Sequence, residues 1–221
     1  MTGAFDLRPE VRDALTEIFN IGIGHAAGVL SELVNDEILL TVPELGVTSR
    51  PEFIAIAGKL WTEPASIVRQ SFSGPFKGDA LLVFPVRESL ELVRALLAEP
   101  APIESMTELE REALLEVGNI ILNACLSCIA DLLEQEITNA LPLYLESDPA
   151  AMVNALITDP DWYVIFLRID FTVKRQNMRD NILFVLDVPA AAAFGAAVER
   201  LVDHFEPGHG ETGPAESGPG T

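Results

Sequence analysis

The chain has 221 residues, and about half of them (49%) are apolar, which is enough for one substantial hydrophobic core. Fourteen Lys and Arg against 34 Asp and Glu leave a formal net charge of −20. Such a charge opposes binding to a nucleic-acid backbone or to an anionic membrane, because both are negatively charged themselves. The composition therefore predicts a folded protein that has neither of these as its partner.

The N-terminus lacks the basic flank and apolar run of a signal peptide. No uninterrupted apolar segment approaches the roughly 18 residues that a membrane span requires. The two cysteines, Cys125 and Cys128, provide no disulfide framework, which agrees with a reducing compartment. We therefore expect a cytoplasmic protein.

A long amphipathic helix is predicted at residues 8–33, because apolar residues recur there every three or four positions. This periodicity indicates one buried helix face. Its predicted members are Val11, Leu15, Ile18, Gly22, Ala26, Val29 and Leu33.

Three strands and a second helix are predicted for the rest of the first half. A short strand at 37–42 is expected to end at Pro43, since proline has no N–H for pairing in a sheet. After a loop rich in Pro, Ser and Glu, strands at 66–72 and 80–84 form a hairpin around a Gly- and Pro-containing turn. A helix at 88–98 closes this half.

The second half repeats the same order of elements. They are a helix at 107–134, a strand at 137–145 that contains Pro142, strands at 162–173 and 181–188, and a helix at 190–205. The segment 206–221, rich in Gly, Pro and Glu, has no apolar residue to anchor it and is expected to be a disordered tail.

The two halves, about 8–99 and 107–205, read as an internal repeat. Three residues of the first half recur 99 positions later in the second: Glu17 as Glu116, Asn20 as Asn119, and Pro43 as Pro142. We predict one α/β domain of the α+β kind at 1–205, in which two α-β-β-β-α units are related by a pseudo-twofold axis. The units would share a mainly antiparallel sheet, with the two long helices side by side on one face.

Polar residues form a stripe on each long helix, opposite the predicted apolar face. On the first helix the stripe consists of Asp13, Glu17, Asn20, Gly24, Ala27 and Ser31. On the second helix it includes Glu112, Glu116, Asn119 and Asn123. A solvated helix face would explain one copy, but Asn is a poor helix former and gains little there. Two copies, each with Glu before and Pro after the Asn, indicate a functional pair.

The spacing of these residues is similar to the signature of the CheC, CheX and FliY chemotaxis phosphatases. That signature is an acidic residue or Ser, three residues, Glu, two residues, Asn, 22 residues and Pro. It reads here as Asp13, Glu17, Asn20, Pro43 and again as Glu112, Glu116, Asn119, Pro142, with Glu112 standing where the signature has Asp or Ser. The stretches NIGIGHAAGVLSEL and FSGPFKGDALLVFP also look like CheC, so the resemblance covers nearly everything except the tail.

The resemblance implies hydrolysis of the aspartyl phosphate of the response regulator CheY. Asn20 or Asn119 would orient the attacking water, and Glu17 or Glu116 would pair with the Lys that receiver domains carry beside the phosphoryl group. The receiver domain supplies its own Mg²⁺, so the phosphatase would need no cofactor. The adaptor CheD, a receptor deamidase, is a further expected partner. The alternative is a non-catalytic module of the same fold that sequesters CheD or docks at the flagellar switch.

Other candidate sites are weaker. Cys125 and Cys128 lie in mid-helix on the apolar face, which favours core packing over redox chemistry. A zinc site would need four ligands. Besides the two cysteines only His25, His204 and His209 remain, and two of these lie at or in the predicted tail, so we expect no metal. His25 is expected to be a packed helix residue. The sequence has no nucleotide-binding glycine loop and no Ser-His-Asp pattern.

Overall fold

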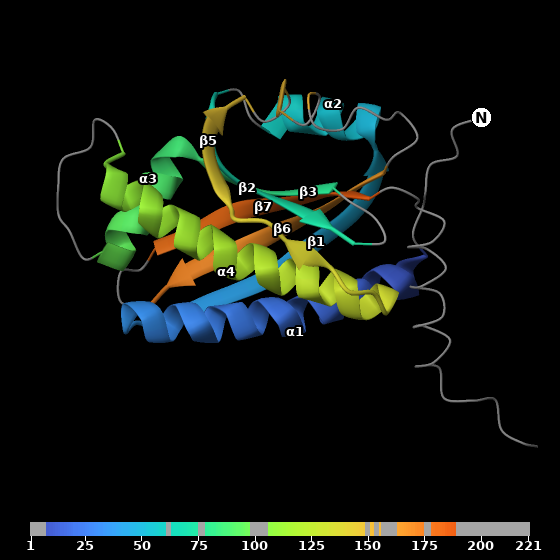
Figure 1. The fold of residues 1–221 in the computed structure, drawn as a ribbon, viewed down its shortest axis with the longest axis horizontal. Coiled ribbons are helices and arrows are strands. Elements are labelled where there is room, and N and C mark those ends of the chain that lie inside the picture. The colour runs from blue at the N-terminus through green and yellow to red at the C-terminus, as the bar shows by residue number, and fades with distance from the viewer. Residues whose placement is uncertain are drawn as a thin grey trace, which may run out of the picture.

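The computed structural model describes residues 8–60, 63–74, 78–97, 106–148, 151–152, 155, 163–174 and 178–188. It has three layers, with helix α2 on one face of an antiparallel sheet and the two long helices α1 and α4 side by side on the other (Figure 1). The helices are α1 (Pro9–Val34), α2 (Arg50–Leu60), α3 (Val86–Leu97) and α4 (Glu108–Leu133). The strands are β1 (Ile38–Ser49), β2 (Ala65–Ser73), β3 (Gly78–Pro85), β4 (Thr138–Asn139), β5 (Leu143–Ser147), β6 (Tyr163–Val173) and β7 (Met178–Val188).

The sheet joins strands from both halves of the chain. Its order is β1-β6-β7-β3-β2-β4, and β5 also pairs with β2. All of these pairs are antiparallel. Strand β1 of the first half borders β6 of the second, and β4 and β5 of the second half border β2 of the first. The prediction of a mixed α/β fold with an antiparallel sheet is therefore confirmed.

The two outer strand pairs have the same register. Glu44 of β1 faces Arg168 of β6, and Leu143 of β5 faces Arg69 of β2. Leu143 follows Glu44 by 99 residues, and Arg168 follows Arg69 by 99. The match continues farther out, in the pairs Leu40 with Phe171 and Asn139 with Phe72. The closing helix expected at 190–205 and the tail at 206–221 lie outside the described residues, so the complete repeat and the domain bounds stay predictions.

The prolines interrupt pairing differently from what the sequence indicates. The prediction that the first strand ends at Pro43 is wrong, because β1 continues to Ser49 after a shift in register between Thr41 and Glu44. An irregularity at the sheet edge accommodates a residue that has no N–H. The strand expected at 137–145 is likewise divided, into β4 and β5, with Pro142 in the gap.

Helix α2 was expected to be loop. It packs Phe53 and Ala57, both fully buried, against the second face of the sheet beside Ile67 and Val83. A spacing of four residues places Phe53 and Ala57 on the same helix face. This helical spacing is visible in the sequence, but it covers only a short segment, and the neighbouring Pro and Ser residues are typical of a loop.

The buried face of α1 is rotated from the predicted one. It consists of Val11, Leu15, Phe19, Ile23, Ala26, Ala27 and Leu30. Of the predicted members, Val29 and Leu33 are 53% and 59% exposed, and Ile18 and Gly22 are half-buried. The reason is that α1 has two neighbours: Phe19 and Ile23 belong to the core against the sheet, while Ile18 and Gly22 face α4.

Helix α4 begins with a capping box, in which Thr107 and Glu110 each accept the other's backbone N–H. It belongs to the main core through Leu114, Val117, Ile121 and other residues. By length and composition alone, residues 108–132 could cross a membrane, yet half of the most apolar window is buried inside the fold. The helix is thus used here as a core helix.

Candidate functional site

The first predicted site lies where α1 crosses the irregular part of β1. Asn20 is half-buried, and its Oδ1 accepts a hydrogen bond from the backbone N–H of Val42 at 2.8 Å. Val42 and Pro43 stand in the register shift and face no residue of β6. Pro43 therefore interrupts the strand pairing, and Asn20 satisfies the N–H beside the interruption. In the first site, this contact links the position of Asn20 on α1 to the interruption at Pro43.

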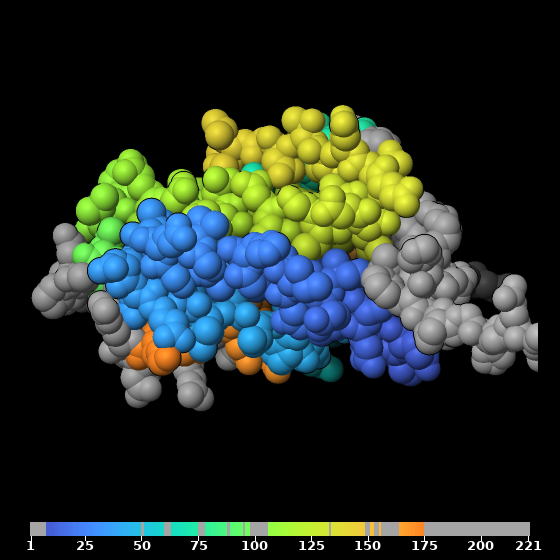
Figure 2. Space-filling model, turned by 90° about the horizontal axis from the view of Figure 1, so that it is seen from below, coloured from blue at the N-terminus to red at the C-terminus, as the bar shows by residue number. Residues whose placement is uncertain are grey.

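The acidic residues of the first site are open to solvent. Glu17 and Asp13 are both exposed, on the turns of α1 that precede Asn20. Among the described residues, neither carboxylate has a hydrogen bond or an ion pair. Figure 2 shows α1 and α4 as one broad surface whose outer side is uncovered by the sheet. The carboxylate of Glu17 is therefore available to a partner.

The second predicted site is built differently. Glu112 and Glu116 are exposed, as on the first helix, and Asn119 is half-buried. The Oδ1 atom of Asn119 accepts hydrogen bonds from Asn123 Nδ2 at 3.0 Å and from Gln70 Nε2 at 3.4 Å. The second Asn is thus held by side-chain amides, whereas the first is held by the backbone.

These contacts belong to a cluster of four amide side chains, which we call the amide cluster: Gln70, Asn119, Asn123 and Asn139. Gln70 is only 1% exposed, and its Nε2 also donates to Asn123 Oδ1 at 3.2 Å and to the carbonyl oxygen of Ala140 at 3.0 Å. Asn139 Nδ2 donates to Asn123 Oδ1 at 2.8 Å. Sequence reasoning missed Gln70 and Asn139, although a Gln within the apolar strand β2 was a usable signal.

The backbone around the second proline also differs from the first. Leu141 corresponds to Val42 in the 99-residue offset, but its side chain is 87% exposed, whereas Val42 is buried. In the described part of the chain, no hydrogen bond joins its N–H to Asn119. Pro142 therefore lies near the second site without the Asn-to-backbone contact that Pro43 accompanies.

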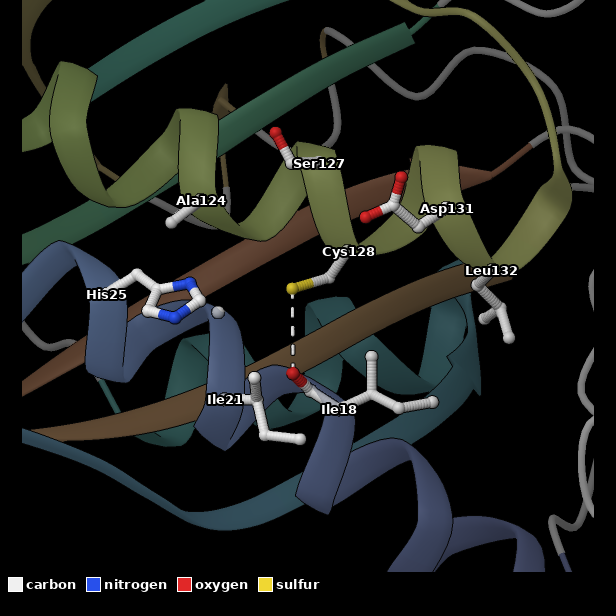
Figure 3. A pocket seen from close by; sticks show the side chains of 9 residues that line it. Ile18, Ile21, His25, Ala124, Ser127, Cys128, Asp131 and Leu132 are labelled. Atoms are coloured by element: carbon white, nitrogen blue, oxygen red, sulfur yellow. Dashed lines mark hydrogen bonds between the residues drawn. The ribbon is translucent and has the colours of Figure 1, made fainter. Parts of the chain in front are cut away.

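A hollow of about 460 Å³ separates the outer sides of α1 and α4, and neither Asn lines it (Figure 3). Its lining residues are Ile18, Ile21, Gly22, His25, Ala124, Ser127, Cys128, Asp131 and Leu132. His25 is exposed at this hollow, so the expectation that it is packed is wrong. The hollow therefore lies between the two helices and apart from both predicted Asn residues.

The cysteines belong to the core. Cys125 and Cys128 are buried and free, as the packing interpretation predicted. Burial raises the pKa of Cys125, and it raises the pKa of Cys128 to about 11, so both thiols stay protonated near neutral pH. Within the described ranges, no three His, Cys, Asp or Glu side chains gather as metal ligands.

Comparison with known proteins shows what the chain as a whole is similar to. The model of the CheC-like family matches residues 10–47, which include Glu17, Asn20 and Pro43. The chain is 30% identical over 139 residues to the CheY-P phosphatase CheC of Bacillus subtilis (strain 168). That match covers 62% of this chain and 66% of the relative, so the shared part spans about two thirds of the relative's length.

Solved structures show the same fold. FliY of Thermotoga maritima has a TM-score of 0.67 at 19% identity, covering 89% of this chain and 98% of its own. The FliG-FliM complex of H. pylori contains a chain with a TM-score of 0.64 at 12% identity, covering 86% of this chain and 100% of its own. The matched motif, the curated relative and the shared fold lead to one conclusion: the chain belongs to the CheC-like family.

Proposed function

We propose that this protein is a phosphatase that hydrolyses the aspartyl phosphate of a CheY-type response regulator. The observation that carries the proposal is Asn20, which a backbone N–H holds in place one turn after Glu17, an exposed residue with no ion pair among the described residues. The activity named for the B. subtilis relative supports the same reaction. The proposed place of action is the cytoplasm, where response regulators work.

Hydrolysis of an aspartyl phosphate requires few catalytic groups from the phosphatase. An acyl phosphate is already reactive, and the receiver domain supplies Mg²⁺, so orientation of a water molecule is the main contribution. A side-chain carbonyl oxygen has two lone pairs. In Asn20 one of them accepts the Val42 N–H, and the described residues leave the other for a water molecule. A water that donates to this oxygen can direct its own lone pair at phosphorus.

Glu17 and Glu116 have the docking role in this proposal. Both are exposed and make no ion pair among the described residues, so neither must leave an internal partner to bind another protein. A carboxylate in this position can pair with the Lys beside the phosphoryl group of the receiver. The exposed outer side of α1 and α4 lets the helices approach a second protein (Figure 2).

A second candidate function is a binding module without catalysis, which sequesters CheD or docks at the flagellar switch. The shared fold with a chain of the FliG-FliM complex favours it, since the same architecture occurs there in a protein-protein assembly. CheD remains a proposed partner in either case.

The test follows the decay of phosphorylated CheY-type receiver, alone and with added protein. We expect faster decay with the wild type and no acceleration with the double variant Asn20→Ala, Asn119→Ala. Repeating both arms with CheD tests whether the adaptor is needed. Circular dichroism controls for folding. A folded wild type that leaves the decay unchanged with and without CheD would favour the binding module.

A further inference from the structure

We propose that Asn123 is a positioning residue of the second site, where its side chain holds Asn119 in the way that the backbone of β1 holds Asn20 in the first. It acts through Asn119 and does not itself contact the phosphoryl group. The inference rests on the proposed phosphatase function.

The nearest donor to each Asn oxygen lies at a similar distance in the two sites. Asn20 Oδ1 accepts the backbone N–H of Val42 at 2.8 Å, and Asn119 Oδ1 accepts from Asn123 Nδ2 at 3.0 Å. A hydrogen bond of this length fixes the direction in which a carboxamide presents its oxygen. Both oxygens are therefore anchored, one by a backbone group and the other by a side chain.

Gln70 also approaches Asn119, but it has too few hydrogens to hold it. Its Nε2 carries two hydrogens and has three acceptors within reach. They are the carbonyl oxygen of Ala140 at 3.0 Å, Asn123 Oδ1 at 3.2 Å and Asn119 Oδ1 at 3.4 Å. The two nearer acceptors take both hydrogens. Asn123 is therefore the donor that holds Asn119, and among the described residues the Asn119 oxygen keeps one lone pair for a water molecule.

The other members of the amide cluster fix the orientation of Asn123. The carbonyl oxygen of Ala140 can only accept, so Gln70 must direct its Nε2 toward it and toward Asn123 Oδ1. Asn139 Nδ2 donates to the same oxygen of Asn123 at 2.8 Å. Because Oδ1 of Asn123 faces two donors, its Nδ2 must face the opposite way, toward Asn119. The amide cluster thus acts on Asn119 through Asn123.

The matched positions of the first half show that the two donors replace each other. Asn123 follows Gly24 by 99 residues, and Gly24 has no side chain with which to hold an Asn. Leu141 follows Val42 by 99 residues, yet in the described part of the chain its N–H makes no hydrogen bond to Asn119. Each half therefore supplies one anchor for its Asn, from a different source.

The substitution Asn123→Asp tests this role, because it changes the one group that faces Asn119. A carboxylate has nearly the shape of a carboxamide, and one of its oxygens can still accept from Gln70 and Asn139. The other oxygen has no hydrogen to donate. It favours a turned Asn119 carboxamide, with Nδ2 in the place of Oδ1.

The decay assay with phosphorylated CheY-type receiver measures the effect in the Asn20→Ala background, where only the second site acts. There Asn123→Asp should lower kcat about tenfold and change KM by less than about twofold, since Glu116 is untouched. Should the Asp variant not fold, Asn123→Ala replaces it. Its expected loss is smaller, about threefold, because the hydrogen that Gln70 then releases can reach Asn119.

Two controls separate positioning from charge and from damage to the fold. Ser127 is exposed one turn farther along α4, so Ser127→Asp adds the same charge without facing Asn119 and should lower kcat less than about twofold. In the Asn119→Ala background, where only Asn20 acts, the loss caused by Asn123→Asp should disappear. Damage to the fold would instead lower the rate in both backgrounds.

Several outcomes would overturn the positioning role and leave the phosphatase function intact. They are an active Asn20→Ala protein that Asn123→Asp does not affect, an equal loss from Ser127→Asp, and equal losses in the two backgrounds. An active wild type that Asn20→Ala silences completely would also overturn it, because the second site would then contribute no catalysis. A wild type without activity, with and without CheD, would contradict the proposed function itself.

Discussion

The side chain of Asn20 has a structural task besides the proposed chemical one, and the two can be separated. Asn20→Ala leaves the Val42 N–H without its acceptor and should lower the free energy of unfolding by about 1 kcal/mol. Asn20→Asp keeps an oxygen for that N–H, so we expect near-wild-type stability. The negative charge would repel the phosphoryl group, and activity should fall at least about tenfold.

Urea unfolding and the decay of phosphorylated receiver, measured on the same two variants, check this prediction. Equal destabilisation by Ala and Asp would mean that the contact with Val42 contributes nothing to stability. An Asp variant with full activity would contradict the water-positioning role of the carboxamide.

The repeated spacing made Glu17 and Asn20 candidates from the sequence alone. It could not explain why the proline matters, because the contact between Asn20 and Val42 depends on where β1 crosses α1. Helix periodicity could not connect Gln70 with Asn119 for a related reason: it selects residues on the same helix, whereas Gln70 approaches Asn119 from a strand. Periodicity within one element says little about partners from another.

Among the elements, α1 shows how periodicity identifies a helix but not the direction of its core face. A helix that packs against two neighbours buries two stripes of residues. The helical periodicity of the sequence gives only one average direction for them. Gly22 marks the second contact, since a Cβ atom there would collide with Sγ of Cys128. The sulfur itself donates to the carbonyl oxygen of Ile18 at 3.6 Å, which keeps the helices close (Figure 3).

This contact predicts that two glycines of α1 respond oppositely to the same substitution. Gly28 has open space around it, so Gly28→Ala should raise the free energy of unfolding by about 1 kcal/mol through helix propensity. Gly22→Ala gains the same propensity but adds an overpacking cost of about 1–3 kcal/mol. It should therefore be the less stable variant in urea unfolding.

The background Cys128→Ala provides the control, because it removes the sulfur that the new methyl group would meet. The difference between the two glycine variants should shrink in that background. Identical effects of Gly22→Ala and Gly28→Ala in the wild-type background would show that the helices adjust without cost.

At the scale of the whole molecule, the halves interlock through the sheet. β1 pairs with a strand of the second half, and β5 pairs with a strand of the first. Neither half therefore forms a separate sheet. The sequence predicted a shared antiparallel sheet because that buries the apolar faces economically. It could not predict the exchange of edge strands, since an alternating pattern defines which face is buried and leaves the neighbouring strand open.

The net charge of −20 affects the stability of the whole fold. Like charges repel more strongly in the compact state than in the extended chain, so the charge lowers the stability of the fold. Salt reduces the effect, because the screening length falls from about 10 Å at 0.1 M to about 3 Å at 1 M. The exposed ion pairs, such as Lys174 with Glu37, are weakened too, but each contributes little.

We therefore expect the thermal midpoint of unfolding to rise steadily as the salt concentration increases from about 0.05 M to about 1 M, because screening strengthens over this range. NaCl and KCl should act alike if screening is the cause. A midpoint that falls with salt would show that the ion pairs stabilise the fold more than the net charge destabilises it.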